Sequence, residues 1–237
     1  MEDMNVLTEC LDSMKIPYTD LQLEQLYRYY ELLIEKNKVM NLTAITDFDE
    51  VMIKHFADSI SLLRYTPLRD KRILDLGTGA GFPGVPLKIF CPDSEFILVD
   101  SINKKLDFVA DVCEELGLND ISVCHSRAED LAHKSDFREQ FDFVVSRAVA
   151  NLATLSELTL GFIKKGGYFV SYKSVAAEEE IEQAKNAIRL MGGKVQKTES
   201  FNLPGSDLER TLIFIKKGVN TPKQYPRKAG TPAKTPL

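Results

Sequence analysis

A glycine-rich segment near residue 80 carries the residue types best suited to holding a small charged ligand. A short apolar run contains Asp75, and Gly77, Gly79, Gly81 and Phe82 follow it. Glycines at this spacing allow a sharp turn and let a ligand approach the backbone, because no Cβ stands in the way. A strand that leads through such a loop into a helix binds its ligand at the carboxyl end of a sheet. We therefore expect these five residues to form part of a cofactor site.

Two classes of nucleotide-like cofactor fit this loop. The spacing from Gly79 to Gly84 matches the dinucleotide fingerprint G-x-G-x-x-G. The spacing from Asp75 to Gly81 matches the D-x-G-x-G-x-G loop of class I methyltransferases, which bind S-adenosylmethionine (SAM). The register favours SAM, because a dinucleotide fingerprint begins where the strand ends, whereas the first glycine here is Gly77. Asp75 also suits a cationic sulfonium better than a pyrophosphate.

Two further segments predict a bound nucleoside. Asp100 ends the next apolar run, about 20 residues on, where a carboxylate can accept hydrogen bonds from both ribose hydroxyls. This serves NAD and SAM alike, and a solvated strand end is the alternative. Residues 126–130, Ser-Arg-Ala-Glu-Asp, follow a third apolar run, where they form either an adenine contact or a polar turn.

The elements that must position these residues alternate between strands and helices. Strands are predicted at 72–76, 95–100, 121–124, 141–146, 167–172 and 210–215. The clearest helix runs from Lys105 to Leu116, with Gly117 as its C-terminal cap. This alternation predicts an α/β fold whose mostly parallel sheet has helices on both faces.

The two ends of the chain differ from this pattern. Residues 1–65 read as a helical extension, with a capping box at Thr19 and Gln22. Residues 66–217 form the α/β domain. Residues 218–237 contain four prolines and little to bury, so we expect a flexible tail.

Composition excludes several classes of protein. Of the 237 residues, 44% are hydrophobic and 27% charged, which excludes a disordered, collagen-like or coiled-coil chain. No apolar run approaches the roughly 20 residues that cross a bilayer. The acidic start lacks the features of a signal peptide. Four widely spaced cysteines indicate reduced thiols and no metal site, so we expect a soluble, cytoplasmic protein.

The net charge of −5 hides an asymmetry. From residue 216 onward there are six basic and no acidic residues, and the remaining 24 basic and 35 acidic residues give the rest of the chain a net charge of −11. A basic segment can bind RNA phosphates. Lys223, Arg227 and Lys228 are therefore candidate substrate contacts, and a solvated terminus is the alternative.

Longer motifs resemble one family. Residues 77–87 read Gly-Thr-Gly-Ala-Gly-Phe-Pro-Gly-Val-Pro-Leu, and Val-Asp-Ser at 99–101, Ser-Arg-Ala-Glu at 126–129 and Ser-Arg-Ala at 146–148 follow. Together they resemble the RsmG (GidB) family of bacterial small-subunit ribosomal RNA guanine-N7 methyltransferases. Asn41-Leu42-Thr43, the pattern from His55 to Ser59, and residues 225–232 match it too, so the resemblance runs from about residue 20 to the C-terminus.

The resemblance implies a Rossmann-like class I SAM-dependent methyltransferase with an antiparallel final strand. It further implies methyl transfer to N7 of one guanosine in the 530 loop of 16S ribosomal RNA, with S-adenosylhomocysteine as the other product. Gly77 and Phe82 would contact SAM, and Ala128 and Glu129 would flank the adenine. Arg147 would lie beside the methionine end or the target base. The partner would be 16S RNA or the small subunit, and we expect a monomer without a membrane partner.

The chemistry fits the residues without a general base, because guanine N7 carries a lone pair and no proton. Arg147 is the candidate catalytic residue, positioning the SAM carboxylate or an RNA phosphate, and a salt bridge to the N-terminal helices is its alternative. Asn41 and His55 form either a polar patch at the mouth of the site or a structural seam. Lys173 either meets a phosphate or is solvated. A small-molecule methyltransferase and a non-catalytic SAM-binding module remain as other functions.

Overall fold

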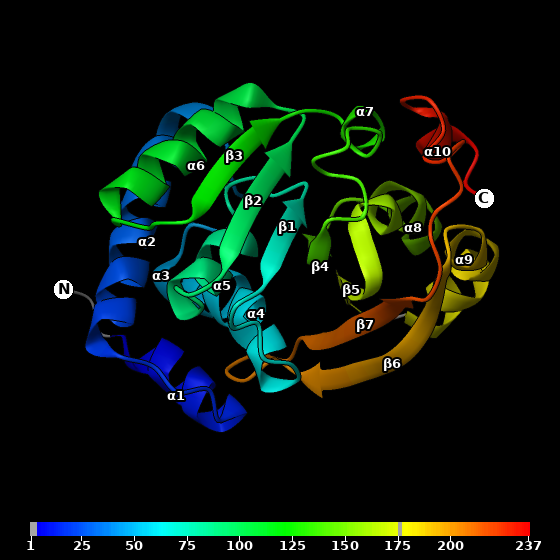
Figure 1. Ribbon diagram of the computed structural model, residues 1–237. Helices are drawn as coiled ribbons and strands as arrows, with labels where there is room; N and C mark the ends of the chain where they lie inside the picture. Colours follow the sequence, from blue (N-terminus) through cyan, green and yellow to red (C-terminus); the bar gives the residue numbers. More distant parts are fainter. Residues whose placement is uncertain (1–3, 175–176) are drawn as a thin grey trace.

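The computed structural model describes residues 4–174 and 177–237, which fold around one seven-stranded sheet (Figure 1). The strand order is β3-β2-β1-β4-β5-β7-β6. The strands are β1 (Arg72–Leu76), β2 (Glu95–Asp100), β3 (Ile121–His125), β4 (Phe141–Arg147), β5 (Ile163–Lys173), β6 (Gly193–Asn202) and β7 (Glu209–Lys217). The first five pair in parallel, and β7 is antiparallel to both β5 and β6. The predicted mostly parallel sheet with an antiparallel final strand is confirmed.

Strand β6 is the one strand that the sequence did not predict. Its residues alternate between partly buried and exposed along its whole length, and none is fully buried. It lies at the edge of the sheet and pairs only with β7. An edge strand of this kind carries polar side chains such as Lys194 and Lys197, so it lacks the apolar run that marks a central strand.

Helices cover both faces of the sheet, as predicted. They are α1 (Asn5–Met14), α2 (Asp20–Met40), α3 (Phe48–Val51), α4 (Asp58–Ile60), α5 (Gly84–Phe90), α6 (Asn103–Glu115), α7 (Ala128–Leu131), α8 (Leu152–Thr159), α9 (Ala177–Leu190) and α10 (Thr231–Lys234). In the described part of the chain, no helix combines the length and apolar character that a membrane span requires.

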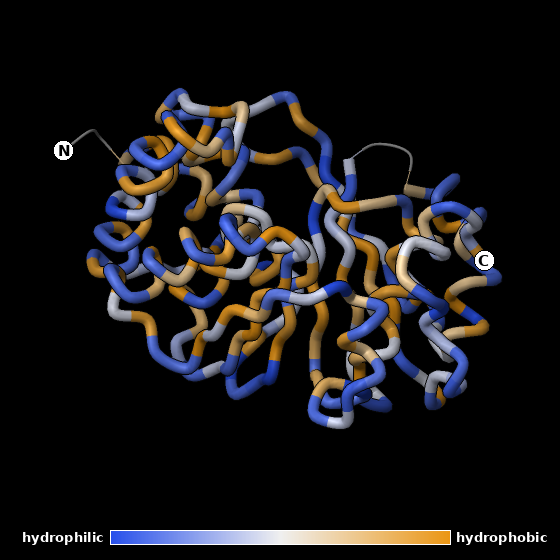
Figure 2. Tube along the Cα trace, turned by 90° about the horizontal axis from the view of Figure 1, so that it is seen from above, coloured by the Kyte–Doolittle hydropathy of each residue, from blue (hydrophilic) through white to orange (hydrophobic). Residues whose placement is uncertain are grey.

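Two hydrophobic cores lie on opposite faces of the sheet, because successive strand side chains point to opposite sides. Ile73 belongs to the core under α2, α5 and α6, and its neighbour Leu74 belongs to the core under α8 and α9. Hydrophobic segments accordingly run through the middle of the molecule, and hydrophilic ones line its outside (Figure 2).

The N-terminal helices share a core with the sheet. The predicted capping box is present, since the Thr19 hydroxyl accepts from the Gln22 backbone and the Gln22 side chain accepts from Thr19 N–H. Tyr29, on the inner face of α2, is completely buried. Between α3 and α4 the helix passes through a π-helical segment, Met52–Ala57, a local irregularity that is frequent at functional sites.

The C-terminal segment differs from the loose tail that its composition predicts. Arg227 pairs with the fully buried carboxylate of Glu157 on α8, and α10 packs on the same helix. Figure 1 shows this red segment beside α7 and α8. Composition could not indicate this docking, because the buried partner lies 70 residues away.

Candidate functional site: a pocket at the carboxyl ends of the strands

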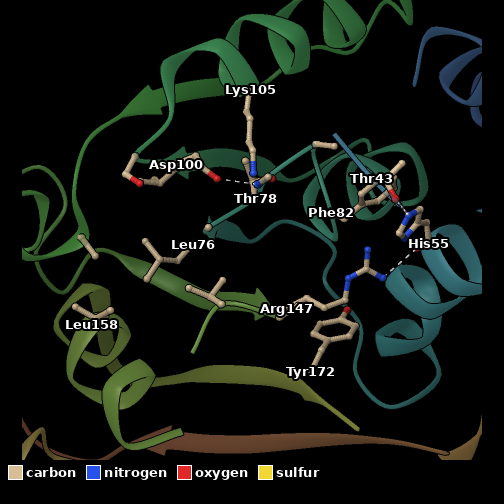
Figure 3. Close-up of a pocket in the computed structure, with 18 of the residues that line it drawn as sticks. Thr43, His55, Leu76, Thr78, Phe82, Asp100, Lys105, Arg147, Leu158 and Tyr172 are labelled. Carbon is tan, nitrogen blue, oxygen red and sulfur yellow. Dashed lines mark hydrogen bonds between the residues drawn. The ribbon is translucent and has the colours of Figure 1, made fainter. Parts of the chain in front are cut away.

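A pocket of about 950 Å³ opens where β1, β2 and β4 end. Its lining comes from the glycine loop after β1, the ends of β2, β4 and β5, the start of β7, helices α7 and α8, and the N-terminal segment 42–58. In Figure 3, Thr78 and Asp100 lie at one end, and Phe82, His55 and Arg147 lie together at the other. The position is the one that parallel sheets use for ligands.

Asp75 shapes the glycine loop from beneath. Its Oδ2 accepts from the Thr78 hydroxyl at 2.7 Å and from Gly84 N–H at 2.8 Å. The side chain is fully buried and does not line the pocket. Burial raises the pKa of the Asp75 carboxyl to about 7, although both hydrogen bonds act in the opposite direction. The predicted contact with a sulfonium is therefore absent from this geometry, and Asp75 acts through the loop.

The three glycines of the loop have different surroundings. Gly79 has a φ of +60°, and a Cβ there would meet open space. A Cβ on Gly81 would lie 2.5 Å from the Tyr29 hydroxyl oxygen, and one on Gly77 would lie 2.4 Å from a methyl of Val149. Gly77 and Gly79 line the pocket, whereas Gly81 packs against α2. Close packing thus requires glycine at positions 77 and 81, whereas the space beside Gly79 is open.

Asp100 holds the loop against β2. Its Oδ2 accepts from Gly79 N–H and its Oδ1 from Ile102 N–H, each at 2.9 Å. The side chain lines the pocket. A carboxylate has about four lone-pair sites, so two remain for the hydroxyls of a ligand.

Ala128 and Glu129 line the pocket from the start of α7. The Glu129 carboxylate also binds the C-terminal segment, because its Oε1 accepts from Gly230 N–H at 2.8 Å. The sequence motif therefore contributes to the pocket wall and to a long-range contact at once.

Arg147 forms the salt bridge to the N-terminal helices that was the alternative reading of this residue. Its Nη1 lies 2.8 Å from Asp58 Oδ2, and Arg210 Nε lies 3.0 Å from Asp58 Oδ1. Both arginines line the pocket. Two guanidiniums around one carboxylate leave this end of the pocket with a net positive charge.

His55 stacks on Phe82 next to this cluster. The ring centroids are 4.6 Å apart, and Tyr29 stacks on Phe82 at 5.4 Å. His55 Nε2 also lies 2.8 Å from the Thr43 hydroxyl. Burial, followed by the charge of Arg147, lowers the pKa of His55 to about 3, so the imidazole is neutral at physiological pH.

The remaining predicted substrate contacts are scattered. Asn41 ends α2 with a φ of +48° and is exposed outside the pocket, although Leu42 and Thr43 line it. Lys173 lines the pocket, with its ammonium 2.7 Å from a Glu180 carboxylate oxygen.

The basic residues of the C-terminal segment lie outside the pocket as well. Lys223 and Lys228 are exposed, and Arg227 is paired with Glu157. The structure therefore brings His55, Lys173 and Arg147 to one pocket and leaves Asn41, Lys223, Arg227 and Lys228 away from it.

Sequence reasoning missed three residues that organise the site. Tyr29 donates its hydroxyl proton to the carbonyl of Ala80 in the glycine loop. Arg210 completes the cluster on Asp58, and Glu157 anchors the C-terminal segment. Only Glu157 left a signal, since a lone acidic residue within the otherwise uncharged helix 152–159 indicates a buried partner.

Within residues 4–174 and 177–237, no three His, Cys, Asp or Glu side chains are grouped so that they could hold a metal ion.

Comparison with known proteins identifies close relatives over the whole chain. The family model for GidB, rRNA small subunit methyltransferase G, matches residues 22–212. Ribosomal RNA small subunit methyltransferase G of Lachnoclostridium phytofermentans is 52% identical over 100% of this chain and 98% of its own. The protein of that name from Lactococcus lactis subsp. cremoris is 48% identical over 96% of each.

Solved structures with low sequence identity share the fold. A ribosomal protein L11 methylase from Lactobacillus delbrueckii subsp. bulgaricus superposes with a TM-score of 0.54 at 14% identity, covering 70% of this chain and 79% of that one. TYW2 of M. jannaschii, solved with AdoMet, gives 0.51 at 13% identity, covering 62% and 69%. The fold is that of class I SAM-dependent methyltransferases.

Proposed function

This chain belongs to the rRNA small subunit methyltransferase G family, and we propose that it transfers the methyl group of SAM to N7 of a guanosine in the 530 loop of 16S ribosomal RNA. The observation that carries the proposal is the pocket itself. It joins a nucleoside-binding end, around Asp100, to a positively charged end, around Arg147, at the carboxyl edge of a class I sheet. We further propose that the protein acts as a cytoplasmic monomer.

The pocket residues fit SAM. Gly79 presents open backbone, and Asp100 retains lone pairs for ribose hydroxyls. Gly77, Gly79, Phe82 and Asp100 would hold the cofactor. Asp75 and Gly81 would act on it only through the shape of the loop, because neither lines the pocket. When bound, SAM supplies an electrophilic methyl group on a sulfonium.

Ala128 and Glu129 would flank the adenine, and Arg147 would meet the carboxylate of SAM or an RNA phosphate. The guanidinium has five donors, so the bond from Nη1 to Asp58 leaves others for a ligand. The excess positive charge of the Arg147, Asp58 and Arg210 cluster would favour an anion at this end.

The state of the pocket's ionisable groups agrees with a reaction that needs no base. Both oxygens of Asp58 are bound to arginines, and Lys173 is paired with Glu180. His55 is a weak base, because burial lowers its pKa to about 3, and its Nε2 lies against the Thr43 hydroxyl. Guanine N7 needs only alignment with the methyl carbon and sulfur, and such positioning contributes about 7–11 kcal/mol in well-oriented reactions.

RNA contacts are proposed at His55 and Lys173 within the pocket, and at Asn41, Lys223 and Lys228 around it. The body of the protein is acidic, which disfavours free RNA as a substrate. A partly assembled small subunit, in which RNA and proteins present the loop together, suits this surface better.

The test incubates the purified protein with methyl-labelled SAM and undermethylated small-subunit particles, or with their RNA alone. The RNA is digested and its nucleosides are identified by mass spectrometry. We expect labelled 7-methylguanosine at a single site, with more from particles than from naked RNA. Bound SAM without any labelled RNA nucleoside would overturn the proposal and favour a small-molecule methyltransferase.

A further inference from the structure

The C-terminal segment connects two helices that border the pocket. Glu129 on α7 and Leu158 on α8 both line it. Residues 225–232 do not, yet they contact both helices. Figure 1 shows the segment passing beside α7 and α8 before it ends in α10.

Arg227 anchors the segment to α8. Its backbone N–H and its Nε donate to Glu157 Oε1 at 2.8 and 2.9 Å, and its Nη2 donates to Oε2 at 2.6 Å. Glu157 is completely buried. A bidentate pair with one buried partner fixes both the position and the direction of the chain. Next to it, the Thr154 hydroxyl donates to the carbonyl of Pro232 at 3.1 Å.

A second set of contacts connects the segment to α7 and the turn that follows it. Gly230 N–H donates to Glu129 Oε1 at 2.8 Å, and His133 Nε2 lies 2.9 Å from the carbonyl oxygen of Pro226. Arg138 donates to the carbonyls of Tyr225 and Ala132 from one nitrogen and to those of Thr221 and Pro222 from the other. The helix α7 itself has only four residues, and these bonds add to the core packing of Leu131 in holding it and the turn that follows.

We propose that Arg227 is a positioning residue for the cofactor, which acts by fixing the segment 225–232 across α8 and α7 and thereby holds Ala128 and Glu129 against the adenine. The inference rests on the proposed function, because it assumes that α7 forms the adenine side of a SAM pocket. The charge of Arg227 alone suggests a contact with RNA phosphates. The inference gives this residue a different role, because its guanidinium is paired with Glu157.

The first experiment follows amide hydrogen exchange of the intact wild-type chain with and without S-adenosylhomocysteine. We expect slower exchange at 128–131 and also at 225–232, which lies outside the pocket. Protection at 128–131 with no change at 225–232 would overturn the proposal. Because no variant is involved, a folding defect cannot confuse this measurement.

The second experiment measures the Kd for S-adenosylhomocysteine by calorimetry in three variants. Arg227→Ala should raise the Kd by about tenfold, a size typical of coupled sites. Arg227→Lys should restore part of the affinity, because an ammonium can still pair with Glu157. The matched control Lys234→Ala removes the same charge at an exposed position of α10 in the same segment, and it should stay within about twofold of wild type.

Steady-state kinetics separate positioning from a general loss of structure. Arg227→Ala should raise KM for SAM and leave kcat within about threefold of wild type, because the chemistry lies at the other end of the pocket. A folded Arg227→Ala variant that binds S-adenosylhomocysteine with the affinity of the wild type would overturn the proposal. Failure of the proposed function would look different. S-adenosylhomocysteine would still protect 225–232 and Arg227→Ala would still raise its Kd, but the wild-type protein would methylate no RNA.

Discussion

Arg147 and Asp58 form a buried ion pair between residues 89 positions apart, with 2.8 Å between Nη1 and Oδ2. The pair joins the end of β4 to the N-terminal helix α4 at the edge of the pocket. Arg210 binds the other oxygen of the same carboxylate, so three elements meet on one side chain. The N-terminal region is thus part of the wall of the site.

Asp58→Ala should destabilise the protein more than Arg147→Ala does. Without Asp58, two largely buried guanidiniums lose their anion, and breaking a buried pair costs about 3–5 kcal/mol. Without Arg147, Asp58 stays paired with Arg210, so the loss is smaller. Urea unfolding of both variants gives the comparison, and an equal or smaller loss for Asp58→Ala would show that the carboxylate does not hold the cluster together.

Arg147→Ala should lower methyl transfer by about 100-fold, the size expected when the reacting groups are misplaced by about 1 Å. Circular dichroism should show an intact fold. Arg69→Ala is the matched control, because Arg69 is an exposed arginine outside the pocket. Unchanged methylation by Arg147→Ala would remove this residue from the catalytic machinery.

His55 should make the protein less stable as the pH falls. The pKa of His55 is about 3 in the folded protein and 6.5 ordinarily. Below pH 6.5, therefore, His55 becomes protonated in the unfolded chain while it stays neutral in the folded one. The contribution of the neutral His55 to the stability of the folded state is fully present above pH 6.5, and it is lost progressively as the pH falls toward 3. Urea unfolding between about pH 7 and pH 4.5 should therefore show a flatter pH dependence for His55→Gln than for wild type.

The control for this measurement is His125→Gln, which removes an exposed histidine from the end of β3. The flattening of the pH dependence should be larger for His55→Gln than for this exposed control. Proton NMR offers a direct check, because the His55 ring signals should not shift between about pH 7 and pH 5. A His55 titration midpoint near 6.5 would contradict its burial against Phe82.

Tyr29→Phe should weaken cofactor binding although Tyr29 lies outside the pocket. The hydroxyl donates to the Ala80 carbonyl, and its loss leaves that buried acceptor without the bond, at a cost of about 1–3 kcal/mol. We expect a lower urea midpoint and a Kd for S-adenosylhomocysteine raised several-fold.

Tyr168→Phe, on β5 before the end of the strand that lines the pocket, serves as the hydroxyl control for Tyr29. It should leave the Kd unchanged, because Tyr168 stacks on Phe143, whereas the Tyr29 hydroxyl bonds to the glycine loop itself. Equal effects of the two variants would show that the glycine loop does not depend on the hydrogen bond from Tyr29 to the Ala80 carbonyl.

The sequence alone predicted the α/β fold class and the two features that form one end of the pocket, the glycine loop and Asp100. The strand–loop–helix order around Gly79, and Asp100 at the end of the next strand, are local patterns whose geometry follows from the backbone. Two helix ends were predicted in the same way, because each depends on residues within a few positions of one another. They are the Gly117 cap of α6 and the capping box at Thr19, and the structure contains both. An edge strand such as β6 escaped prediction because half of its surface is solvated and leaves no apolar run.

Only the tertiary structure decided the partners of the charged residues. Asp58 binds Arg147 and Arg210, and Arg227 binds Glu157, across separations of 70 to 152 residues. Spacing along the chain carries no information about such pairs, because a charged side chain finds its partner only after the sheet and helices have come together. The same physics turned a segment that reads as a loose basic tail into an ordered segment docked on α8, since a buried carboxylate requires a paired cation.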